Sequence, residues 1–71
     1  MKTIRLTFER EDDAREMYHS TAIQSMIASK DISASYNNTH PNDLIIKFND
    51  PYDRNVFTTV YDLAYFYCFY N

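Results

Sequence analysis

Aromatic side chains crowd the C-terminal end of this chain. Six of the last eleven residues carry a ring, namely Tyr61, Tyr65, Phe66, Tyr67, Phe69 and Tyr70. On a helix these rings would point in every direction around the axis. A helix that is apolar on all sides is normally enclosed on all sides, and a chain of 71 residues offers only one sheet to pack against. We therefore expect part of this helix to contact a partner molecule.

The chain is too short to gain much stability from a core of its own. We expect a single domain over residues 1–71, and such a core rarely contributes more than about 3–5 kcal/mol. Small proteins usually add a disulfide, a metal or a partner subunit. The lone Cys68 excludes an internal disulfide, and Cys68, His19 and His40 lack metal-ligand spacing. The sequence therefore predicts a homodimer or a higher oligomer.

Motifs of catalysis are missing. Glycine is absent, and the loops that cradle phosphates or dinucleotides depend on it. Histidine is the most common general acid or base in catalysis, and neither His19 nor His40 has a nucleophile or an orienting group nearby in the sequence. We predict a protein that is not an enzyme and that has no catalytic, cofactor or metal site.

The charge balance bears on possible partners. A net charge of −3 disfavours nucleic acid, because affinity for phosphates comes mainly from Lys and Arg. Acidic residues concentrate between Glu9 and Glu16, where Arg10 and Arg15 interrupt them, which favours the start of a helix over an acidic decoy surface. No secretory signal or membrane span is expected, and a free thiol agrees with a reducing compartment. The sequence predicts a soluble cytoplasmic protein without membrane contact.

Three segments alternate apolar and polar side chains with a period of two, which is typical of half-buried strands. They are residues 3–8, 32–37 and 44–48. Between the last two, residues 37–43 contain His40-Pro41 and many turn formers, so we expect a hairpin loop there. One face of the sheet would carry the apolar residues Ile4, Leu6, Phe8, Ile32, Ala34, Tyr36, Leu44, Ile46 and Phe48.

Two helices complete the pattern. The first is expected to begin with Asp12 or Asp13 as its N-cap and to run to about Ala28, and the second to begin with Asp50 as its N-cap and Pro51 in its first turn. The order β-α-β-β-α predicts an α+β fold, in which a three-stranded antiparallel-type sheet of order 2-3-1 has both helices on one face. This looks like a split β-α-β unit without its last strand, a fold that implies no function. It leaves strand one as an open edge.

The predicted interface lies on these helices. On the last helix, Val56, Val60, Leu63, Ala64 and Tyr67 form a core stripe; Tyr61, Tyr65 and Phe69 form a second stripe, with Phe66 on one flank. We expect the second group to bind protein, although these rings could also lie over the sheet edge. On the first helix Ile23, Met26 and Ile27 fall opposite Ala14 and Met17. Either that helix bends and ends near Ser25, or these three residues extend the same interface.

The uncovered face of the sheet would be polar. It lacks the aromatic residues on which RNA-recognition sheets stack bases. Arg5 and Lys47 lie on adjacent strands of this face and could bind an anion.

These observations predict a small non-enzymatic protein-interaction module that self-associates through its aromatic C-terminal helix. Its size and its Asn-, Tyr- and Ile-rich composition favour a phage-type or mobile-element inhibitor that occludes a host protein in the host cytoplasm. The alternative is a protein that sequesters a small anionic ligand or nucleotide at an oligomer interface.

Overall fold

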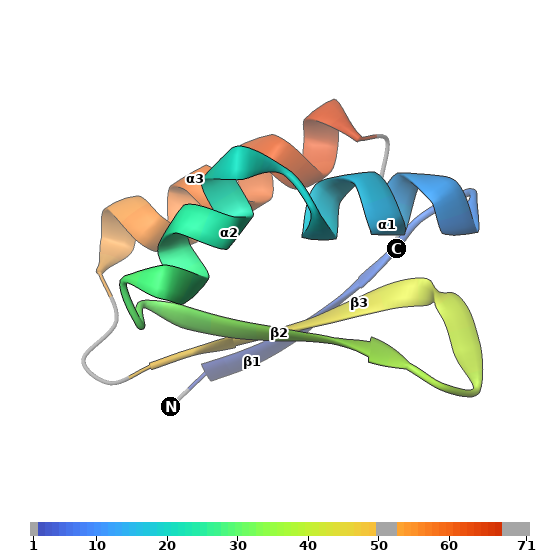
Figure 1. Cartoon of the computed structure of the whole chain (residues 1–71), viewed down its shortest axis with the longest axis horizontal. Helices are drawn as coiled ribbons and strands as arrows, with labels where there is room; N and C mark the ends of the chain where they lie inside the picture. Colours follow the sequence, from blue (N-terminus) through green and yellow to red (C-terminus); the bar gives the residue numbers. More distant parts are fainter. Residues whose placement is uncertain (1, 50–52, 68–71) are drawn as a thin grey trace.

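Three helices lie on one face of a three-stranded sheet (Figure 1). The computed structural model describes residues 2–49 and 53–67. In chain order the elements are β1 (Lys2–Thr7), α1 (Glu11–Tyr18), α2 (Thr21–Ala28), β2 (Ile32–Asn37), β3 (His40–Phe48) and α3 (Arg54–Phe66). The predicted α+β class is confirmed.

The sheet has the predicted strand order. β3 is the central strand, antiparallel to both β1 and β2. The register places Ile4 and Ala34 on either side of Ile46, so apolar side chains of all three strands meet at one level. This leaves two open edges in the described part of the chain, one along β1 as predicted and one along β2.

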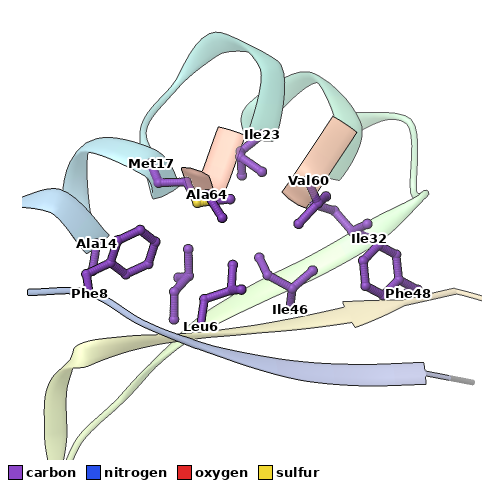
Figure 2. Close-up of a cluster of buried hydrophobic side chains, with 11 residues drawn as sticks. Leu6, Phe8, Ala14, Met17, Ile23, Ile32, Ile46, Phe48, Val60 and Ala64 are labelled. Carbon is purple, nitrogen blue, oxygen red and sulfur yellow. The ribbon is translucent and has the colours of Figure 1, made fainter. Parts of the chain in front are cut away.

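The core lies between the sheet and the helices (Figure 2). The predicted apolar face forms its floor, except that Ile4 and Ala34 are half-buried and Tyr36, at the sheet margin, is 37% exposed. A large-to-small change in such a core removes contacts that cannot be replaced elsewhere. The buried apolar residues are Leu6, Phe8, Ala14, Met17, Ile23, Ile32, Leu44, Ile46, Phe48, Val60 and Ala64.

The predicted first helix is two helices, α1 and α2, joined at Ser20. The Ser20 hydroxyl donates to the Met17 carbonyl (2.7 Å) and accepts from the Ile23 N–H (3.3 Å), so it caps the start of α2 just after α1 ends. The change of direction brings Ile23 into the same core as Ala14 and Met17 (Figure 2). A bend was one of the two expectations, but it occurs at Ser20 and not near Ser25.

The predicted helix starts also need correction. Arg10 occupies the N-cap position of α1, so neither of the expected caps, Asp12 or Asp13, caps it, and both lie in the first turn. Asp13 is buried, and its carboxylate accepts from Arg10 Nε (3.2 Å) and Nη2 (3.0 Å). This bond raises the pKa of the Arg10 guanidinium.

The last helix begins at Arg54, where Asp53 is the N-cap and its carboxylate accepts from the Asn55 N–H (2.7 Å). The expected start at Asp50 and Pro51 lies outside the described residues.

The expected hairpin loop is much shorter than predicted. Only Asn38 and Thr39 separate β2 from β3, and the Asn37 side chain accepts from the Thr39 N–H (3.0 Å) to stabilise the turn. Pro41 lies inside β3, at the point where the register with β2 shifts between Tyr36 and Asn37. A β-bulge tolerates a residue that cannot donate to the ladder.

The end of α2 places a lysine where glycine is favoured. Asp31 N–H donates to the Met26 carbonyl and Lys30 N–H to the Ile27 carbonyl, both at 3.0 Å, and Lys30 has φ 64°. We expect Lys30→Gly to raise the free energy of unfolding by about 0.5–1 kcal/mol in urea titrations, because Cβ disfavours this conformation. Lys30→Ala keeps Cβ and is the control. An equal gain in both variants would assign the effect to the lost charge.

Candidate interaction surface

Helix α3 presents one side to the core and aromatic rings on other sides. Val60 and Ala64 are buried, and Val56, Leu63 and Tyr67 pack partly against them, which confirms the predicted core stripe. Next to this core stripe, four aromatic side chains lie on the remaining sides of the helix. They are Phe57, Tyr61, Tyr65 and Phe66, and we call them the α3 aromatic surface.

The rings of this surface become more exposed along the helix. Phe57 packs on buried Phe48 with ring centroids 5.1 Å apart, and Tyr61 lies 4.9 Å from Phe57. Tyr65 is 69% and Phe66 75% exposed. Apolar rings at this exposure are costly in water unless a partner covers them.

Tyr61 differs from its prediction. It was expected on the exposed stripe, but it is half-buried and packs against the core cluster. It still reaches the surface, because a shallow hollow of about 390 Å³ is lined by Phe57, Thr58, Tyr61, Asp62 and Tyr65. The predicted contact residue Phe69 lies outside the described residues. Tyr65 and Phe66 are exposed as expected.

The three interface residues predicted on the first helix are not an exposed cluster. Ile23 is fully buried in the core, so its expected place on the surface is wrong. Met26 and Ile27 are half-buried and pack against the same core. Ser20, three residues earlier, is the N-cap whose new helix turns Ile23 inward, but a serine is also acceptable inside a helix, so the sequence carried no decisive signal for Ile23.

The predicted anion site already contains a carboxylate. Arg5 Nε lies 3.6 Å from Asp43 Oδ2, and Thr7 Oγ1 donates to Asp43 Oδ1 (2.9 Å). Asp43 is 5% exposed, so it offsets the charge of Arg5 from within the sheet. Lys47 is exposed, opposite Thr3 and Ser33. This arrangement weakens the case for an anionic ligand, since one of the two cations has a partner.

Sequence reasoning missed Asp43 because it assigned residues 37–43 to a loop. Asp43 continues the period-two pattern of Ile45 and Lys47, and this pattern could have placed it in the strand.

A second hollow lies beside the margin of β2. Its volume is about 240 Å³, and its lining is Glu11, Arg15, Tyr36, Asn37, Asn38 and Pro41. The Tyr36 ring packs on Tyr18 with centroids 5.0 Å apart. Burial raises the pKa of Tyr36, and the positive charge of Arg15 partly opposes this shift. The hollow therefore combines an aromatic wall with charged groups of α1.

The chemistry-bearing residues are dispersed. His19 and His40 are exposed on different elements, α1's C-cap and the first residue of β3. Within residues 2–49 and 53–67, no group of three or more His, Cys, Asp or Glu side chains could hold a metal ion. No helix in that part of the chain is long and apolar enough to cross a membrane.

Comparisons with protein-family models, with curated proteins and with solved structures find no match.

Proposed function

We propose that this protein is a small non-enzymatic interaction module whose α3 aromatic surface joins copies of the chain and covers a protein target. The observation that carries the proposal is the exposure of Tyr65 and Phe66, 69% and 75%; Tyr65 also lines a hollow that has aromatic walls. Tyr and Phe are enriched at the centres of protein interfaces, where rings fill hollows of the partner. An inhibitor that occludes a cytoplasmic protein is the biological role we propose for this surface.

The available energy suits a weak, concentration-dependent contact. Full burial of a large apolar side chain is worth about 1.5–3 kcal/mol. A two-fold contact buries Tyr65 and Phe66 from both copies, and because these rings are already partly covered in one copy, the four together supply at most about 6–12 kcal/mol. Association costs about 4–15 kcal/mol, a range of the same size, so these rings alone support only a weak contact.

We expect the double variant Tyr65→Ser/Phe66→Ser to form an assembly of fewer subunits than the parent protein at tens of micromolar. The molar mass is measured by size-exclusion chromatography with light scattering. Both side chains are exposed, so the free energy of unfolding should change by less than about 0.5 kcal/mol per site.

The matched control exchanges the two side chains, Tyr65→Phe/Phe66→Tyr, and keeps the aromatic area at both positions. It should assemble like the parent protein. An unchanged mass in the serine variant would overturn the proposal, and loss of its circular dichroism signal would show that these rings belong to the core.

A further inference from the structure

The side of the molecule formed by α2 and β2 is nearly free of charge. Across residues 20–39, which contain both elements, the only charged side chains are the neighbours Lys30 and Asp31. In Figure 1 α2 lies above β2 along one edge of the sheet. The other edge, β1, carries Lys2 and Arg5. Proteins commonly protect an open edge with charged side chains, and β2 lacks that protection.

The backbone of β2 has unused hydrogen-bonding groups on its outer side. Asn49 N–H donates to the Asp31 carbonyl (3.0 Å), so Asp31 faces β3. Along an antiparallel strand the backbone N–H and C=O groups of successive residues point to opposite edges. Those of Ser33 and Ser35 therefore also point to β3, whereas those of Ile32, Ala34 and Tyr36 point outward. None of the described strands pairs with this side. The edge is ready to accept another strand.

The sequence of β2 is complementary to itself. Ile32, Ser33, Ala34, Ser35 and Tyr36 read as apolar, Ser, Ala, Ser, apolar about Ala34. In an antiparallel pair with its two-fold axis at Ala34, Ser33 meets Ser35 of the second copy on the open face. Ile32 meets Tyr36 of the second copy on the helix side. The two alanines at the axis are small enough for close approach, and their outward backbone groups form a hydrogen-bonded pair.

Pairing about Ala34 places Asp31, just before β2, opposite Asn37 of the second copy, so no charged side chains of the two β2 strands oppose each other. Lys30 has φ 64° and does not continue the pairing. Asn37 lines the hollow that contains Arg15, whose guanidinium already pairs with Glu11 and Asp12 of its own helix. By contrast, self-pairing of β1 would bring its own basic side chains together.

We propose that the occupant of the β2 edge is a second copy of this chain, paired antiparallel about Ala34 to give a continuous six-stranded sheet of order β1-β3-β2-β2-β3-β1. This contact is separate from the α3 aromatic surface. It goes beyond the proposed function because it assigns a second interface and its register.

The test places charges at the two serines in the Tyr65→Ser/Phe66→Ser background, where the α3 contact is removed. Ser33 and Ser35 are exposed, so the fold should tolerate the changes. Ser33→Glu/Ser35→Glu puts like charges opposite each other twice in the proposed register. We expect its association constant to fall about tenfold or more at low salt, measured by sedimentation equilibrium.

The matched control is Ser33→Glu/Ser35→Lys, which makes two opposite-charge pairs only when position 33 meets position 35 of the second copy. It should remain a dimer, because each new acid then faces a new lysine of the second copy. A register with its axis at Ser33 or Ser35 would instead pair 33 with 33 or 35 with 35. In both variants the Ser33→Glu change faces Lys47 of its own sheet, so its effect on the fold is matched, and unfolding of each monomer is compared for the change at Ser35.

The outcomes separate this inference from the proposed function. A Tyr65→Ser/Phe66→Ser protein that is already monomeric at tens of micromolar overturns the β2 contact and leaves the α3 contact standing. Equal association of the two charge variants also overturns it. A parent protein whose mass does not change on loss of the two rings, but falls on Ser33→Glu/Ser35→Glu, supports the β2 contact and contradicts the α3 contact.

Discussion

Replacing Phe48 with alanine is expected to unfold most of the protein at room temperature. Phe48 is fully buried at the end of β3, where its register partners are Lys2 on β1 and Ile32 on β2. Its ring also packs on Phe57 of α3, with centroids 5.1 Å apart. Loss of a buried phenylalanine costs about 3–5 kcal/mol, which equals the stability that a core of this size supplies.

The measurement is thermal and urea unfolding followed by circular dichroism, at a concentration low enough to populate the monomer. Phe66→Ala is the control, since it removes the same ring from a side chain that is 75% exposed. It should change the free energy of unfolding by less than about 0.5 kcal/mol. Equal losses in the two variants would show that Phe66 is as much a part of the core as Phe48.

The sheet could be predicted because its signal is local. Alternation along 3–8, 32–37 and 44–48 fixes which side chains face the helices, and a slip by one residue would expose all of them. With one apolar face per strand, few compact arrangements of the elements remain. Strand order β1-β3-β2 and the uncovered polar face followed from this.

The breaks within elements could not be predicted in the same way, because they depend on contacts between elements. Ser20 is acceptable within a helix or as a cap, and only the burial of Ile23 against the sheet decides for the cap. Pro41 reads as a loop residue, yet pairing of Thr7 with Asp43 draws that segment into β3. The buried carboxylate of Asp43 and its contact with Arg5 follow from the same pairing.

The candidate surface was predicted in outline and corrected in detail. Aromatic spacing identified Tyr65 and Phe66 as exposed, since a helix packed through Val60 and Ala64 must turn them outward. Helical spacing also placed Tyr61 outward. Its ring is long enough to lie back on Phe57, and only the packed structure shows this.

Ile23→Ala is the second change with a large expected effect, and it tests the largest correction to the sequence-based interpretation. Ile23 is fully buried between α2 and the sheet, so truncation should cost about 2–5 kcal/mol in urea titrations at low protein concentration. Ile23→Val should cost about 0.5–1.5 kcal/mol, a graded response typical of a packed site. Ser25→Ala, on the exposed side of the same helix, should stay within about 0.5 kcal/mol. If Ile23→Ala instead weakens association while leaving the unfolding transition of the monomer in place, Ile23 faces a partner, as the sequence predicted, and α2 is turned the other way.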